Sequence, residues 1–153
     1  MEPLIQWICD LCGKVIEKPE DGYVAWGENE QRQIDRIRIL HKNNHVNGHI
    51  PGCGHDNFRS PMSQPLESLL GDNGKVYLLS MIDPDPGLCW EFSKRIADMR
   101  LFLEFFRRVQ LPYYEEARMY WGKARSDSFF DGANEIWTYL PRNLKAVNRN
   151  VFC

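Results

Sequence analysis

The sequence predicts an α+β protein in which a zinc-ribbon-like β unit, residues 1–60, packs on a small α-helical unit, residues 61–153. Three observations predict this architecture. The chain before residue 60 is rich in Gly, Asn, His and Cys and holds only short β-like runs. After residue 60 come long segments whose apolar residues recur with helical spacing. A Cys-x-x-Cys-Gly motif near the N-terminus is typical of a zinc knuckle.

The β unit is expected to contain short strands joined by tight turns. Strands are predicted at residues 5–8, 14–17, 23–26 and 34–41. The last of these alternates isoleucine with arginine over residues 36–39, which is the period of a strand with one buried face. Residues 42–61 are rich in Asn, Gly and Pro and predict a long loop. A loop of this length needs something to hold it in place.

The second part of the chain is expected to be helical. Helices are predicted at residues 65–70, 74–82, 90–110, 112–124 and 144–151. The third of these has apolar residues in alternating steps of four and three, which indicates a helix buried along one face. Pro112 suits the first turn of the next helix. Pro141 is expected to break the last helical segment, so that this helix begins at Leu144.

The motif Cys9-x-x-Cys12-Gly13 is the strongest chemical signal in the chain. Two thiolates at this spacing point at one metal ion when the chain turns tightly between them, and the following glycine lets the backbone fold back. Thioredoxin-like redox sites use the same spacing but begin a helix there. Residues 13–16 read as a continuing strand, which favours a metal site.

A structural zinc site needs two further ligands. The candidates lie within residues 41–55 and comprise His41, His45, His49, Cys53 and His55. Cys53 lies in a Pro-Gly-Cys-Gly turn that resembles the first knuckle, and His41 ends a strand. The predicted set for a structural Zn²⁺ is Cys9, Cys12, His41 and Cys53. His55 is the next candidate for the fourth position, and His45 and His49 are interpreted as solvated loop residues.

Composition and charge narrow the class of protein. Hydrophobic residues make up 43% and charged residues 26% of the chain, which excludes disordered, collagen-like and coiled-coil proteins. The net charge of −2 gives no overall basic field. An odd count of five cysteines suits a reducing compartment, and Cys89 and Cys153 are predicted to be plain thiols. With no secretory signal and no apolar run of about 20 residues, the sequence predicts a cytoplasmic protein without membrane association.

These observations favour a non-catalytic adaptor or regulator that binds another macromolecule. The macromolecule that they favour is a protein. The sequence shows no carboxylate pair, nucleophile–base set, P-loop or zinc-protease motif, so no enzyme activity and no small-molecule substrate are predicted. The aromatic residues Trp7, Tyr23 and Trp26 are the candidate contacts with the partner. In the alternative interpretation, two of these three aromatic residues cover the zinc site and do not contact a partner.

Two other functions stay open. In a nucleic-acid-binding zinc module, the basic residues Arg107, Arg108, Arg142, Lys145 and Arg149 would hold phosphates, because residues 91–153 carry 11 Lys/Arg against 8 Asp/Glu. The aromatic stripe behind Pro112 would then be a base-stacking platform instead of core. In an HNH-type nuclease, His45 would be the base, Asn57 would position it, and a metal would assist cleavage. The second Cys-x-x-Cys that often brackets such sites is missing.

Four segments resemble a family of small bacterial and phage proteins that begin with a Cys-x-x-Cys-Gly knuckle. The segments are residues 7–16, 21–26, 37–42 and 111–118, so the resemblance spans much of residues 5–125. In such proteins a histidine at a strand end and a later cysteine look like the second half of the zinc site. The resemblance therefore implies His41 and Cys53 as ligands, and it implies no particular activity.

Overall fold

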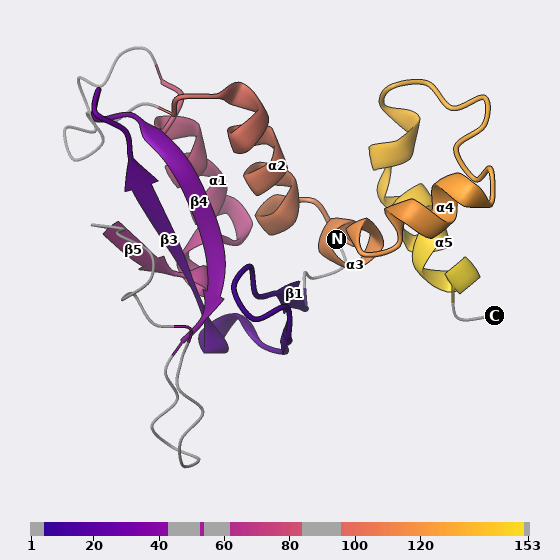
Figure 1. Cartoon of the computed structure of the whole chain (residues 1–153), viewed down its shortest axis with the longest axis horizontal. Coiled ribbons are helices and arrows are strands. Elements are labelled where there is room, and N and C mark those ends of the chain that lie inside the picture. The colour runs from indigo at the N-terminus through magenta and orange to yellow at the C-terminus, as the bar shows by residue number, and fades with distance from the viewer. Residues whose placement is uncertain (1–4, 43–52, 54–61, 84–95, 152–153) are drawn as a thin grey trace.

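A computed structural model describes residues 5–42, 53, 62–83 and 96–151 and shows a mixed α+β fold, as predicted. A small antiparallel sheet lies at one end of the molecule, and helices extend from one of its faces toward the other end (Figure 1). The elements are β1 (Trp7–Ile8), β2 (Val15–Ile16), β3 (Gly22–Glu28), β4 (Ile34–His41), β5 (Met62–Pro65), α1 (Gly71–Ser80), α2 (Met99–Gln110), α3 (Tyr114–Arg118), α4 (Trp121–Ser126) and α5 (Pro141–Val151).

The main sheet has the strand order β4-β3-β5, and β1 and β2 form a separate two-stranded sheet. The hairpin of β3 and β4 pairs Gly22 with His41 at one end and Trp26 with Ile37 toward the other. All four predicted strands are present. The sequence did not predict β5, which pairs antiparallel with β3 from Tyr23↔Pro65 to Trp26↔Met62. Its sequence, Met-Ser-Gln-Pro, has little β-favouring character, so backbone pairing at the sheet edge decides its structure.

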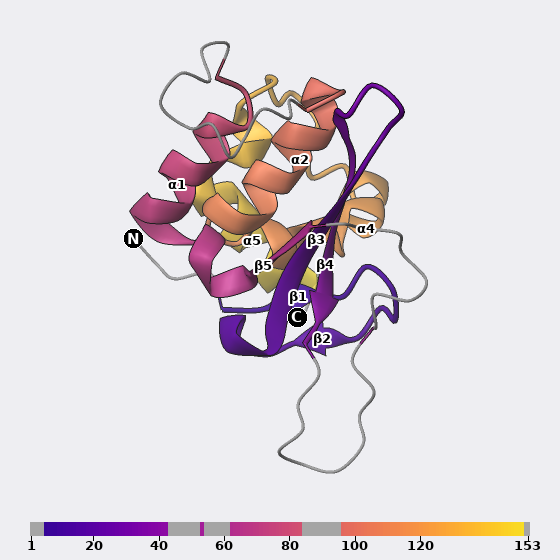
Figure 2. The same ribbon diagram turned by 90° about the vertical axis from the view of Figure 1, so that its left-hand side faces the viewer.

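Helices α1 and α2 cover one face of the sheet, as the turned view shows (Figure 2). The apolar cluster between them and the strands includes Trp26, Ile39, Leu78, Phe105 and Val109, which are all buried. This cluster joins residues on both sides of position 60. The division into units 1–60 and 61–153 as separate folding units stays a prediction.

Helices α3, α4 and α5 form a second apolar cluster at the far end of the molecule (Figure 1). Its buried members are Tyr114, Ala117, Ala124, Leu144 and Val147. Within the described parts of the chain, no helix is long and apolar enough to cross a membrane.

Several helix boundaries differ from the predicted ones. Residues 66–69 form a 3-10 helix, and α2 begins at Met99, where the Asp98 carboxylate accepts a hydrogen bond from the Arg100 N–H. Residues 90–95 of that predicted helix lie outside the described residues. The segment predicted as one helix over 112–124 forms two short ones, α3 and α4. Pro141 is the first residue of α5 and does not break it, because the first turn needs no N–H from that position.

A close approach between α1 and the preceding turn gives a stability prediction. A Cβ atom on Gly74 would overlap the backbone carbonyl of Leu69, to which the Gln110 side chain also donates a hydrogen bond of 2.6 Å. Gly74→Ala should therefore lower the free energy of unfolding by about 1–3 kcal/mol. The matched control is Gly122→Ala in α4, where a Cβ meets nothing within 4 Å. That change should raise stability by about 0.5–1 kcal/mol. Urea denaturation with equal midpoints for the two variants would contradict the packing described.

Candidate metal centre

Four side chains from three separate segments meet at one end of the main sheet. Cys9 and Cys12 lie in the turn between β1 and β2, His41 is the last residue of β4, and Cys53 follows in the loop. Their candidate ligand atoms all lie within 4.8 Å of one another. The structure thus brings together the four residues of the predicted set. His45, His49 and His55 lie outside the described residues.

The first two cysteines are held by a knuckle-shaped turn. The Cys9 N–H donates to the Lys14 carbonyl at 2.9 Å, and the Gly13 N–H donates back to the Cys9 carbonyl at 3.0 Å. Gly13 has a φ of +70°, a conformation that costs glycine little because it has no Cβ. The turn places both sulfurs on the same side, where the end of β4 lies.

His41 is positioned by bonds between the knuckle and β4. The Asp10 N–H donates to the Ile39 carbonyl at 2.8 Å, and the Ile39 N–H donates to the Asp10 carboxylate at 2.7 Å. The His41 Nε2 lies 3.1 Å from the carbonyl oxygen of Val15 and, as its donor, carries the ring proton. This leaves the lone pair of Nδ1 free to bind a metal ion. That Nδ1 atom lies 3.3 Å from the sulfur of Cys12.

Cys53 completes the group from the opposite side. Its sulfur lies 3.4 Å from that of Cys9 and 4.0 Å from Nδ1 of His41. The Tyr23 hydroxyl donates a hydrogen bond of 2.7 Å to the Cys53 carbonyl and anchors the backbone to β3. The site therefore draws on the knuckle and both strands of the β3–β4 hairpin.

These separations fit a tetrahedral ion. With metal–sulfur bonds of about 2.3 Å and a metal–nitrogen bond of about 2.0–2.1 Å, two sulfurs lie about 3.8 Å apart and a sulfur lies about 3.6 Å from the nitrogen. The sulfur–sulfur distance of 3.4 Å and the sulfur–nitrogen distances of 3.3 and 4.0 Å are close to these values. Three thiols and one imidazole are donors that soft and borderline divalent metals prefer. The cluster could thus bind a metal ion.

The electrostatics of the thiols also suit a cation. Burial acts to raise the pKa of Cys9, but hydrogen bonds from the backbone of Cys12, Leu11 and His41 outweigh it and lower this pKa to about 6. Burial, followed by interactions with the other two cysteines, raises the pKa of Cys53 to about 12. The charge of the neighbouring cysteines thus opposes ionisation of Cys53, and a divalent cation bound among the sulfurs would remove this opposition.

A buried ion network behind the knuckle joins it to the helices. Arg108 of α2 is 6% exposed and Glu115 of α3 is 1% exposed. The Arg108 guanidinium donates to both oxygens of Glu115 at 2.8 Å and to the Asp10 carboxylate at 2.8 and 3.0 Å. It also donates to the carbonyl of Ile8, whose N–H donates to Glu115. The end of β1 and Asp10 of the knuckle are thereby tied to α2 and α3.

Three residues predicted as contacts with a partner or with phosphates are buried, so these predictions are wrong. Arg108 does not lie on a basic surface that could hold phosphates, because it is buried and paired with two carboxylates. Trp7 and Trp26 are fully buried, so neither is available to a partner. The Trp7 indole donates to the Arg108 carbonyl at 3.0 Å. Tyr23 keeps partial exposure.

The nuclease hypothesis depends on residues that the structure does not describe. His45 and Asn57 of the nuclease hypothesis lie outside the described residues, as do Cys89 and Cys153.

No protein-family model matches the sequence, and neither a curated protein nor a solved structure is significantly similar to it.

Proposed function

We propose that the cluster holds a structural Zn²⁺ and that the chain is a non-catalytic adaptor or regulator that acts by binding another protein. One observation carries the proposal. The three thiols and one imidazole lie within 4.8 Å of one another, so together they fill all four positions of a tetrahedral ion. A site filled in this way has no position for the water or substrate that a catalytic zinc must bind.

The size of the knuckle supports a structural role for the ion. Strands β1 and β2 are two residues long each, which is too short for a stable hairpin on its own. Zinc binding contributes about 10–16 kcal/mol in zinc-finger peptides and would add to the burial of Trp7 and Ile16 in holding such a segment. The Asp10–Arg108 ion pair at 2.8 Å would then couple occupancy of the site to the packing of α2.

A groove beside the knuckle supplies the contact surface in this proposal. A depression of about 240 Å³ lies between the β1–β2 sheet and α3, and its lining is mostly apolar. Val15 and Met119 line it and are 44% and 52% exposed. Glu116 also lines it and forms no ion pair with any described residue. A protein segment with an apolar side chain next to a lysine or arginine would match this surface.

The partner-binding part of the proposal is tested by affinity capture with three baits. Met119→Asp places a charge in the groove and should abolish capture of the partner that the unmodified chain retains. Ile136→Asp is the matched control, because Ile136 is an apolar residue outside the groove lining that is 69% exposed, somewhat more than Met119. Retention of the same proteins by all three baits would contradict the assignment of the groove. Capture of nucleic acid alone, lost at raised salt, would favour the nucleic-acid-binding alternative.

A further inference from the structure

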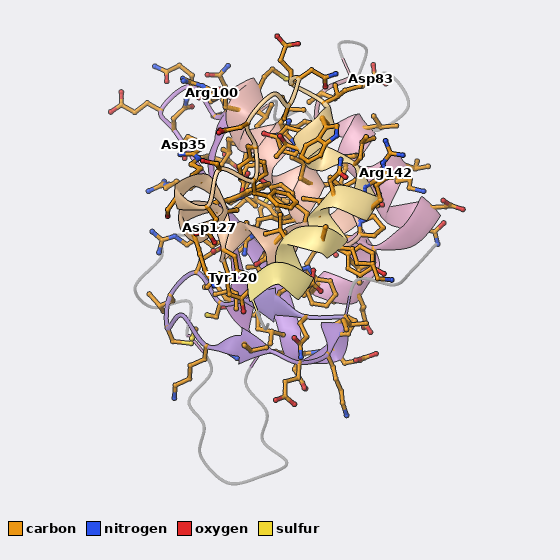
Figure 3. The ribbon with its side chains drawn as sticks, turned by 90° about the vertical axis from the view of Figure 1, so that its right-hand side faces the viewer. Asp35, Asp83, Arg100, Tyr120, Asp127 and Arg142 are labelled. Atoms are coloured by element: carbon orange, nitrogen blue, oxygen red, sulfur yellow. The ribbon has the colours of Figure 1, made fainter. Side chains whose placement is uncertain are left out.

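A second cavity lies in the helical end of the molecule, far from the cysteine cluster in the fold. It is open to solvent on one side, has a volume of about 300 Å³ and is lined by Tyr114, Trp121, Arg125, Phe130, Thr138 and Tyr139. These residues come from α3, α4 and the segment that leads to α5. Figure 3 looks onto this end of the molecule, with Tyr120 just before α4 and Arg142 in α5 labelled. The volume is at the lower limit for small-molecule sites, which range from about 300 to 1,000 Å³.

Four aromatic rings surround the cavity at angles to one another. The ring of Trp121 lies 5.2 Å from that of Phe130, 6.1 Å from that of Tyr114 and 6.4 Å from that of Tyr139, measured between centroids. The planes of these pairs meet at 49–79°. Trp121 and Phe130 are only partly buried and line the cavity, so they present ring surface on which a flat ligand ring can stack.

The polar groups at the cavity favour an anion. Arg125 is exposed and forms no ion pair with any described residue. The guanidinium of Arg107 lies 3.9 Å from the ring centroid of Tyr139. None of the described lining residues carries a carboxylate. Glu104, which accepts the Tyr114 hydroxyl hydrogen bond, also lies 3.8 Å from Arg118, so its charge is partly balanced.

We propose that this cavity binds a nucleobase that carries a phosphate. The base would stack against Trp121 and Phe130, and the phosphate would accept hydrogen bonds from the Arg125 guanidinium. Aromatic cages that select quaternary ammonium ligands contain no unpaired guanidinium, and a purely apolar ligand would leave Arg125 without a partner. This site is independent of the zinc site and of the groove beside the knuckle.

The test compares matched probes by calorimetric titration of the full chain. Adenosine 5′-monophosphate should bind at least about tenfold more tightly than adenosine or inorganic phosphate, because only the nucleotide makes both contacts. Arg125→Gln should remove this advantage and leave adenosine binding unchanged. Lys123→Gln is the matched control, since Lys123 is exposed on the same helix but does not line the cavity. Phe130→Leu should weaken binding of adenosine and the nucleotide alike.

A base that carries a phosphate can belong to a free nucleotide or to a single-stranded nucleic acid. Titration with a single-stranded oligodeoxyadenylate distinguishes these two sources. Binding of the oligonucleotide and the mononucleotide with equal affinity identifies a free nucleotide. Tighter, salt-dependent binding of the oligonucleotide identifies single-stranded nucleic acid. The proposal is overturned if the nucleotide binds no better than adenosine, if Arg125→Gln and Lys123→Gln have equal effects, or if choline competes with the nucleotide.

Discussion

Replacing Cys9 with serine should remove the metal ion and unfold the knuckle together with the β1–β2 sheet. Cys9 is buried, its sulfur lies 3.4 Å from that of Cys53, and the strands on either side of it are only two residues long each, so their pairing alone adds little stability. Structural zinc contributes about 10–16 kcal/mol in zinc-finger peptides, so the loss should exceed that of any core substitution in this chain. Elemental analysis gives zinc per chain, and circular dichroism follows the fold.

Two controls separate loss of the metal from a general effect of the substitution. Treatment of the unmodified protein with a chelator should reproduce the spectrum of Cys9→Ser, and zinc should restore it. Cys89→Ser should keep both the metal and the fold, because Cys89 is predicted to be a plain thiol. Cys12→Ser and Cys53→Ser should behave as Cys9→Ser does. Equal metal content in the unmodified chain and the Cys12 variant would contradict the proposed four-ligand zinc site.

Arg108→Ala should destabilise the protein by about 3–5 kcal/mol, the cost of breaking a buried ion pair by removing one partner. The change removes the two hydrogen bonds that Arg108 donates to the Glu115 carboxylate, which is 1% exposed, and it separates Asp10 from α2. Interactions with Arg108 and Arg118 outweigh burial and keep the pKa of Glu115 below its usual value, so this carboxylate stays charged in the folded protein. The free energy of unfolding in urea measures the loss.

Arg100→Ala is the matched control for this prediction. The Arg100 side chain is 91% exposed and pairs with Asp98 at the surface, on the same helix. A surface pair of this kind contributes about 0–1 kcal/mol. Arg108→Lys, which keeps the charge but not the forked geometry, should fall between the two alanine variants. Alanine variants that differ by less than about 1 kcal/mol would show that the network does not hold the knuckle on the helices.

The sequence predicted the parts of the site that depend on local pattern. The Cys-x-x-Cys-Gly spacing indicates the geometry of Cys9 and Cys12, the predicted strand end indicates His41, and the Pro-Gly-Cys-Gly turn indicates Cys53. The alternating pattern of β4 and the apolar spacing of α2 depend on one face being buried, so they too are visible in the sequence.

The elements that the sequence did not predict depend on distant partners. Arg108 reads as a surface cation, and its burial follows only from Asp10, which lies 98 residues earlier, and from Glu115. The pairing of β5 with β3 is made by backbone groups, which leave little trace in side-chain pattern. Trp7 and Trp26 carried no signal of burial, because aromatic residues occur both in cores and at contact surfaces.

The most direct measurement is X-ray absorption at the zinc edge of the purified full chain. The account predicts one zinc per chain with three sulfur neighbours at about 2.3 Å and one nitrogen neighbour at about 2.0–2.1 Å, with no bound water. This result would establish the four-ligand structural site from which the adaptor function is argued. An ion with two sulfur neighbours and added oxygen, or a protein that holds no zinc, would contradict it. The first of these results would point to an open and therefore catalytic metal site.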